Sequence, residues 1–185
     1  MHPKMEGRII LSTELLQLTL KRLCHQLIEN YNDFSNTVII GLQPRGIYLA
    51  EKIVECIKKQ TKVTVEYGRL DITFYRDDFR TREKPIHAST TSLEVSLENK
   101  KVLLVDDVLY TGRTIRAALD AMLSFGRPLN VELLVLIDRR FNRELPIQPD
   151  YFGKVVDTID GEKVKVKWQS EDGEENVYLI KEKRK

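Results

Sequence analysis

The sequence has few of the residues and patterns that metal and redox sites require. It contains two cysteines, Cys24 and Cys56, and three histidines, and none forms a CxxC pair or stands at metal-ligand spacing. We interpret both cysteines as reduced packing residues within helices and expect no transition-metal site. No stretch is long and apolar enough to span a bilayer, and the start MHPKMEGRII lacks the apolar core of a signal peptide. We therefore expect a cytoplasmic protein with no membrane partner.

Two common phosphate-binding motifs and any strong charge imbalance are also missing. There is no GxxxxGK[ST] loop of nucleoside triphosphatases and no GxGxxG loop of dinucleotide-binding proteins. The 30 basic and 28 acidic side chains give a formal net charge of +2, so the overall balance does not demand a nucleic-acid partner. Length and composition, 185 residues with 42% hydrophobic and 31% charged, predict one globular domain over residues 1–185.

Helical and strand-like segments alternate through much of the chain. Leucines spaced by three and four residues predict a helix from Glu14 to about Glu29, and similar spacing predicts another from Gly46 to about Lys59. Apolar runs at Thr37–Leu42, Lys101–Val105 and Val131–Ile137 are typical of strands buried on both faces. This alternation predicts an α/β fold with an open, mostly parallel sheet flanked by helices.

Two other segments follow a different pattern. Residues 76–99 are rich in charge, Ser and Thr, which predicts a long flexible loop or an exposed hairpin. Lys163–Trp168 alternates charged and apolar residues, and Val177–Ile180 forms another short run after a turn at Gly173. These last two runs predict a small exposed antiparallel hairpin.

An acidic pair stands at the expected end of the second buried strand. Asp106 and Asp107 follow KVLLV, and ligands of open parallel sheets bind beyond the carboxyl ends of the strands. The next residues, Leu109–Thr114, combine a glycine, two threonines and a helix start, which together favour binding of an anion. Such a pair suits a ligand with a phosphate, vicinal hydroxyls and a metal-bound polyphosphate. The alternative is an ordinary strand end followed by a turn and a helix cap.

The segment VLLVDDVLYTGRT, Val102–Thr114, resembles the signature with which type I phosphoribosyltransferases bind phosphoribosyl pyrophosphate (PRPP). GLQPRGIYLA, DITFYRDD, DDVLYTGRTIRAALDA and RELPIQPDYFGK together resemble the uracil phosphoribosyltransferases that double as pyrimidine-operon attenuation regulators. The likeness covers Ile9 to about Val166. It implies a type I phosphoribosyltransferase fold with a catalytic loop over about residues 76–91, which closes over PRPP, and with a hood and C-terminal hairpin in residues 139–185.

The resemblance also implies residue roles. Arg45 would bind the pyrophosphate, although the segment Gln43–Gly46 taken alone also fits a simple turn. Asp106 and Asp107 would hold the ribose hydroxyls directly or through Mg²⁺. The loop that follows them would bind the 5′-phosphate. Base choice would lie with Asp138, Arg139 and the hood, with solvated loop charges as the alternative for Arg139 and Arg140. The expected catalytic residues are Asp106, Asp107 and Arg45, the first two also as metal ligands, and the expected substrate-binding residues are Pro44, Arg45, Gly46, Asp106, Asp107, Val108, Leu109, Tyr110, Thr111, Gly112, Arg113, Thr114, Asp138, Arg139 and Val164.

Two functions fit this resemblance, and both can hold for one protein. The first is an enzyme, expected as a homodimer or homotetramer, that makes uridine monophosphate (UMP) from uracil and PRPP. The second is a regulator that senses uridine nucleotides and binds a pyrimidine-operon leader RNA. A transferase for another nucleobase is a further alternative, since IDRRFNR departs from the family's shorter run. Candidate RNA contacts are Arg8, Lys21, Arg22, Arg76, Arg80, Arg82, Arg113, Arg116, Arg139, Arg140 and Arg143.

Overall fold

The computed structural model describes residues 7–75, 91–159 and 161–181, and the structural statements below concern these residues. None of the helices within these ranges is long and apolar enough to cross a membrane. In chain order the elements are β1 (Gly7–Leu11), α1 (Thr13–Tyr31), β2 (Thr37–Leu42), α2 (Gly46–Thr61), β3 (Glu66–Leu70), the 3-10 turn η1 (Thr73–Tyr75), β4 (Lys101–Leu109), α3 (Arg113–Met122), the 3-10 turn η2 (Leu123–Phe125), β5 (Asn130–Arg140), β6 (Tyr151–Asp157), β7 (Glu162–Lys167), α4 (Gln169–Asp172) and β8 (Asn176–Lys181).

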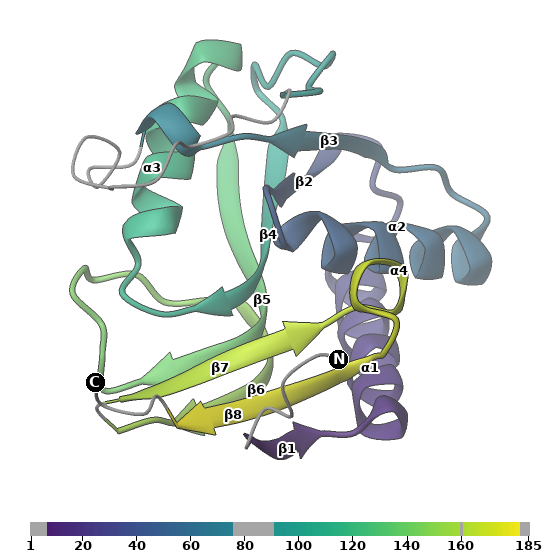
Figure 1. Ribbon diagram of the computed structural model, residues 1–185. Coiled ribbons are helices and arrows are strands. Elements are labelled where there is room, and N and C mark those ends of the chain that lie inside the picture. Colours follow the sequence, from purple (N-terminus) through teal and green to yellow (C-terminus); the bar gives the residue numbers. More distant parts are fainter. Residues whose placement is uncertain (1–6, 76–90, 160, 182–185) are drawn as a thin grey trace.

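A five-stranded parallel sheet in the order β3-β2-β4-β5-β6 forms the centre of the molecule (Figure 1). Because successive strand residues point to opposite faces, Ile39 and Leu103 pack toward α1 and α2, whereas Val38 and Leu104 pack toward α3. Helices therefore cover both faces, and the predicted α/β fold is confirmed. The run Thr37–Leu42 was predicted with these bounds, and all six of its residues are buried.

A second, antiparallel sheet in the order β1-β8-β7 forms the hood (Figure 1). The predicted hairpin of β7 and β8 is confirmed, but the third strand, β1, was not predicted. Its five residues, GRIIL, are too few to show a strand period, and they become a strand only by pairing with β8. Val166, Trp168 and Val177 extend the core beneath α1 and α2, so the hood is joined to the main domain by apolar packing.

The hood is smaller than residues 139–185, which corrects one prediction. β6 lies within that range, but it pairs with β5 as the edge strand of the main sheet. Among the described residues of this range, the hood sheet takes β7 and β8, and its third strand, β1, comes from the opposite end of the chain. The periodicity of YFGKVVD, the sequence of β6, does not show which strand it pairs with, because that partner is decided by tertiary contacts.

The polar segment predicted as a loop over residues 76–99 is described only in part. Residues 76–90, which carry most of the expected catalytic loop, lie outside the described residues. Residues 91–99 are anchored, because Ser92 forms a bridge with Arg69 and Leu97 is 0% exposed. β3 includes Gly68, where a Cβ would lie 2.3 Å from Cδ1 of Leu93, so the absence of a side chain lets residues 91–99 pack against this strand. Residues 91–99 thus form a loop in which Leu93 and Leu97 are buried, whereas Ser92, Glu94, Ser96, Glu98 and Asn99 are exposed.

Candidate active site

Three neighbouring strands bring the predicted residues to one edge of the sheet. In the parallel register Gly41 lies opposite Val105, and Leu109 lies opposite Asp138. The loops that follow β2, β4 and β5 therefore leave the same edge, as the parallel sheet requires. The strands are longer than predicted, since β4 continues to Leu109 and β5 to Arg140. Asp106 and Asp107 consequently lie within β4, and ladder bonds fix their backbone.

The close approach of the β2–α2 loop to β4 depends on Gly46. A Cβ at this position would lie 2.4 Å from the carbonyl oxygen of Val105 and 2.9 Å from the Cα of Asp106. Both neighbours are backbone atoms of a central strand, which cannot turn aside as a long side chain does. The loop Gln43–Gly46 thus rests directly on the strand that carries the acidic pair, and its Gln43–Pro44 peptide bond is cis.

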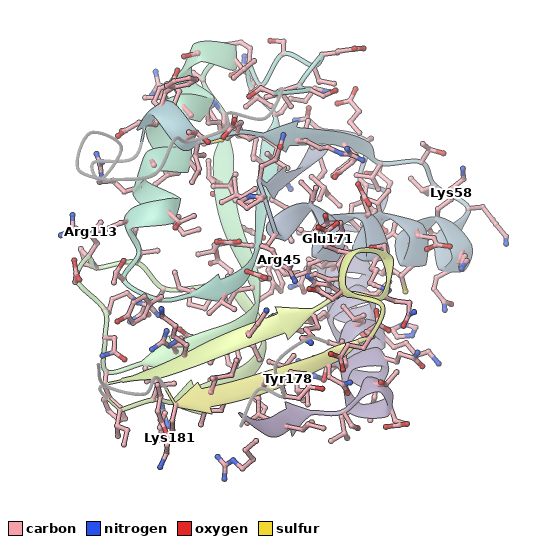
Figure 2. All side chains as sticks on the ribbon, in the orientation of Figure 1. Arg45, Lys58, Arg113, Glu171, Tyr178 and Lys181 are labelled. Atoms are coloured by element: carbon pink, nitrogen blue, oxygen red, sulfur yellow. The ribbon has the colours of Figure 1, made fainter. Side chains whose placement is uncertain are left out.

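Arg45 connects three parts of the site. Its Nε lies 3.8 Å from Oδ2 of Asp107, and its Nη2 donates hydrogen bonds to the carbonyl oxygen of Val166 at 2.5 Å and to Oδ2 of Asp172 at 2.8 Å. Figure 2 shows Arg45 at the start of α2, close to the α4 turn that carries Glu171. The predicted cation therefore stands beside the predicted carboxylate pair, and it also contacts the hood.

The two aspartates of β4 are strongly desolvated. Asp106 is 8% exposed, and its Oδ1 accepts a hydrogen bond from the backbone N–H of Asp107 at 2.9 Å. Burial raises the pKa of Asp107 to about 6, although Arg45 acts in the opposite direction. A carboxylate kept partly out of water in this way gains from further positive charge. The pair suits a metal ion that also binds an anionic ligand.

The segment that follows β5 is hydrogen-bonded to the loop Tyr110–Thr114. The carbonyl oxygen of Thr111 accepts hydrogen bonds from the N–H groups of Glu144 at 3.0 Å and Leu145 at 3.2 Å, and Arg113 pairs with Glu144 at 2.5 Å. Gly112 has φ of 92° and serves as the N-cap of α3 without a capping side chain. This left-handed conformation is easy only for glycine. The loop thus ends at the positive end of a helix, as a phosphate site requires.

The residues expected to choose the base have different environments. Arg139 is only 6% exposed, and its guanidinium lies 3.8 Å from the ring centroid of Tyr110. It is not a solvated loop charge, and its burial also removes it from the candidate RNA contacts. Arg140, at the end of β5, is exposed and pairs with Asp157 at 2.7 Å. Asp138 forms an ion pair with Arg143, which also donates to the carbonyl oxygen of Tyr110.

The remaining predicted contacts differ in what they can offer a ligand. Pro44 is exposed in the loop Gln43–Gly46, and Val164 is half-buried in the middle of β7. Leu109 is 1% exposed and packs in the core with Val135, so only its backbone can reach a ligand. Val108 packs against the core on the α1 and α2 face.

Several residues around the site had no signal in the sequence. Asp172 and Glu162 meet the predicted arginines only through the folding of the hood, and Thr158 accepts a hydrogen bond from Arg139 at 3.2 Å. Arg143 and Glu144 belong to the motif RELPIQPDYFGK, which was used to identify a family but not to place side chains. In the described part of the chain, no group of three or more His, Cys, Asp or Glu residues is arranged to hold a metal ion.

Comparisons with known proteins agree with this geometry. Residues 8–171 match the family model described as phosphoribosyl transferase domain. The chain is 46% identical over 172 residues to Bifunctional protein PyrR of Synechocystis sp., covering 93% of this chain and 96% of that protein. It is 42% identical over 180 residues to Bifunctional protein pyrR of Enterococcus faecalis, covering 97% and 98%.

Solved structures support the same fold. A hypoxanthine phosphoribosyltransferase of Trypanosoma cruzi aligns with a TM-score of 0.71 at 16% identity, covering 95% of this chain and 97% of that one. One of Staphylococcus aureus aligns with a TM-score of 0.69 at 21% identity, covering 98% and 94%. At such low identity these likenesses show the fold alone. The family match and the PyrR relatives together establish that this chain belongs to the phosphoribosyltransferase family.

Proposed function

We propose that this protein transfers the phosphoribosyl group of PRPP to uracil, forming UMP and pyrophosphate. The observation that carries the proposal is the meeting of Arg45, the pair Asp106 and Asp107, and the loop Tyr110–Thr114 at one sheet edge. PRPP has a pyrophosphate, a ribose and a 5′-phosphate in that order along the molecule. The site offers a cation, two carboxylates and a helix start capped by Gly112 in the matching order.

In this reaction the bond between C1 of the ribose and the pyrophosphate oxygen breaks, and a bond from C1 to N1 of uracil forms. The proton of N1 is lost in the same step and passes to an oxygen of the departing pyrophosphate or to water. Positive charge develops on the sugar and negative charge on the leaving group. Arg45 is positioned to donate hydrogen bonds to the departing pyrophosphate, and the carboxylates of Asp106 and Asp107 accept hydrogen bonds from the ribose hydroxyls. Catalysis then consists of positioning and charge stabilisation, and it requires no side-chain nucleophile.

The residues of the site fit a bound Mg²⁺. Asp106 and Asp107 would hold it, since Mg²⁺ commonly takes one or two carboxylates from the protein and fills its other positions with phosphate oxygens and water. This explains how two carboxylates suffice when no larger acidic cluster is found among the described residues. The ion would neutralise charge on the pyrophosphate. Its positive charge would also keep Asp107 ionised, although burial, opposed by Arg45, raises the pKa of that carboxyl to about 6.

Val164 and Asp138 are the proposed contacts of the base. Val164 lies at the middle of β7, and Asp138 lies near the carboxyl end of β5, opposite Leu109 in the neighbouring strand. The role proposed for Arg139 is revised from direct contact with the base to support of the residues around it. Its Nη2 donates to the carbonyl oxygen of Glu162 at 2.9 Å, and its guanidinium face covers Tyr110.

A product assay tests the proposed reaction directly. The protein is incubated with PRPP, Mg²⁺ and either uracil, hypoxanthine, guanine or orotate, and the nucleotide products are separated by chromatography. We expect UMP from uracil and at most trace product from the other bases. Product from a purine base alone would refute the choice of uracil, and no product from any base would refute the transferase.

We also propose that the protein binds a pyrimidine-operon leader RNA. This proposal is supported by the name of the relatives, Bifunctional protein PyrR, because the word bifunctional indicates a second function besides that of the phosphoribosyl transferase domain. Leader RNA is titrated at several salt concentrations, with and without UMP. We expect specific, UMP-dependent binding whose affinity falls steeply with salt. Equal binding of an unrelated RNA would refute this function.

We also propose a homodimer or homotetramer, and light scattering tests this oligomeric state.

A further inference from the structure

Strand β7 of the hood is held at both ends by arginine side chains from the main domain. Near its end, the carbonyl oxygen of Val166 accepts a hydrogen bond from Arg45 at 2.5 Å. At its start, the carbonyl oxygen of Glu162 accepts one from Arg139 at 2.9 Å. Val164, the proposed base contact, lies midway between these two carbonyl groups. The position of the base-binding strand therefore depends on where the two guanidinium groups lie.

The Arg45 end is tied to the pyrophosphate loop through the turn α4. The same Oδ2 of Asp172 that accepts from Arg45 at 2.8 Å also accepts from the backbone N–H of Trp168 at 2.9 Å. Trp168 directly follows β7 and is 0% exposed. A movement of Arg45 toward a pyrophosphate oxygen, away from Asp172, would alter the bond that caps this turn. Occupancy of the pyrophosphate loop is thus linked to the end of β7.

The Arg139 end is tied to the 5′-phosphate loop. The guanidinium lies against the ring of Tyr110, the first residue of that loop, and its Nε donates to Oγ1 of Thr158 at 3.2 Å. Arg139 is almost completely buried, so these contacts are not exchanged for water as those of an exposed arginine are. A shift of Tyr110 when phosphate binds would move the group that supports Glu162.

We propose that Asp172 and Arg139 are positioning residues that couple the two PRPP-binding loops to strand β7, so that bound PRPP increases the affinity for the base. This inference rests on the proposed transferase function. Coupling of this kind is reciprocal for binding, and the bound base must equally increase the affinity for PRPP. Neither residue touches the substrates in this scheme, since Asp172 acts through Arg45 and Arg139 acts through Tyr110 and Glu162.

Trp168 supplies a readout that does not depend on turnover. It is the single tryptophan of the chain, and its ring lies near two side chains of α2, 5.9 Å from Nζ of Lys52 and 6.5 Å from the ring of Tyr48. PRPP with Mg²⁺ is titrated into the protein without base, while Trp168 fluorescence and heat of binding are followed in parallel. We expect a saturable fluorescence change in the wild type at the concentration where heat shows binding.

Variants at α4 separate coupling from binding. In Asp172→Ala the fluorescence change should fall at least threefold while calorimetry still detects PRPP binding. Asp172→Asn keeps an oxygen that can accept from the Trp168 amide, so its fluorescence change should lie between those of the wild type and Asp172→Ala. The matched control is Glu171→Gln, which loses a charge on the same turn but contacts the hydroxyl of Tyr48 instead of Arg45. It should retain the full change. Thermal unfolding of each variant verifies that it is folded.

Initial rates over a grid of PRPP and uracil concentrations test the effect on the base. In the wild type PRPP should increase the affinity for uracil about fivefold or more, a common size for coupling between sites. Asp172→Ala and Arg139→Lys should reduce this factor to less than about twofold, raising KM for uracil more than they lower kcat. The control for the second variant is Arg140→Ala, whose exposed side chain pairs with Asp157.

The outcomes distinguish the coupling from the function on which it rests. The coupling is refuted, while the transferase stands, if the wild type binds PRPP without a change in Trp168 fluorescence. It is also refuted if Asp172→Ala keeps both the full fluorescence change and the full increase in affinity for uracil that PRPP causes. If the wild type binds no PRPP, the proposed function fails and the coupling fails with it.

Discussion

Replacing Gly46 with alanine is a sharp test of the structure, because local reasoning and tertiary packing predict opposite results. Gly46 is the first residue of α2, and alanine is the better helix former by about 1 kcal/mol in a helix interior. The position carries no positive φ that would favour glycine. From α2 alone, Gly46→Ala should therefore be neutral or slightly stabilising.

The packing against β4 reverses this expectation. The new Cβ would lie 2.4 Å from the carbonyl oxygen of Val105, whereas contacts below 3.0 Å are essentially never seen for real Cβ atoms. The loop must therefore move away from β4 by more than half an ångström. Overpacking of this kind costs about 1–3 kcal/mol, which for a chain of this size lowers Tm by a few to about 10 °C. Arg45, the preceding residue, moves with the loop, and a displacement of about 1 Å near a reacting centre can reduce turnover about a hundredfold.

The assay measures PRPP-dependent UMP formation and thermal unfolding of the same preparations. Gly7→Ala is the matched control, because the nearest atom to its new Cβ is a side-chain carbon of Ile180 at 3.2 Å, which can shift slightly. The control should keep turnover within about twofold and change Tm by less than Gly46→Ala does. Wild-type turnover and an unchanged or raised Tm in Gly46→Ala would refute the close contact between the loop Gln43–Gly46 and β4.

Two further substitutions separate catalysis from stability. Asp107→Asn should reduce turnover on the order of a hundredfold, yet raise the Tm of the ligand-free and metal-free protein at pH 8. Burial raises the pKa of Asp107 from its ordinary 3.8 to about 6, so stability falls as the pH rises between these two values and the penalty is complete above about pH 6. The gain from Asp107→Asn should therefore largely disappear by pH 4, where the folded carboxyl is protonated. A gain independent of pH would contradict this cause. Tyr151→Phe removes a hydroxyl that donates to Glu132 at 2.8 Å and accepts from Asn30 at 3.1 Å. It should lower the free energy of unfolding by about 1–2 kcal/mol in a denaturant titration and leave turnover unchanged, because Glu132 lies near the amino end of β5, away from the site.

The predicted site residues were found by motif, and the structure changed the role of some of them. Asp106, Asp107 and the loop Tyr110–Thr114 are contiguous in sequence, so a local pattern can identify them. Arg139 was predicted in the right neighbourhood, but its burial against Tyr110 could not be foreseen, because β5 was expected to end before it. Asp172 was not predicted, because its partner Arg45 lies 127 residues away in the chain.

The sequence by itself determined the elements whose signal is local. Apolar runs such as Thr37–Leu42 are typical of strands buried on both faces, and the alternation of such runs with helices predicts a parallel sheet whose carboxyl edge carries the candidate site. Only the tertiary structure decided that β1 joins the hood, that β6 joins the main sheet, and that Arg45 and Arg139 donate hydrogen bonds to the two ends of β7. The physical reason is that strand partners and long arginine side chains are chosen by what folding brings near them, and neither choice leaves a period or a spacing in the chain.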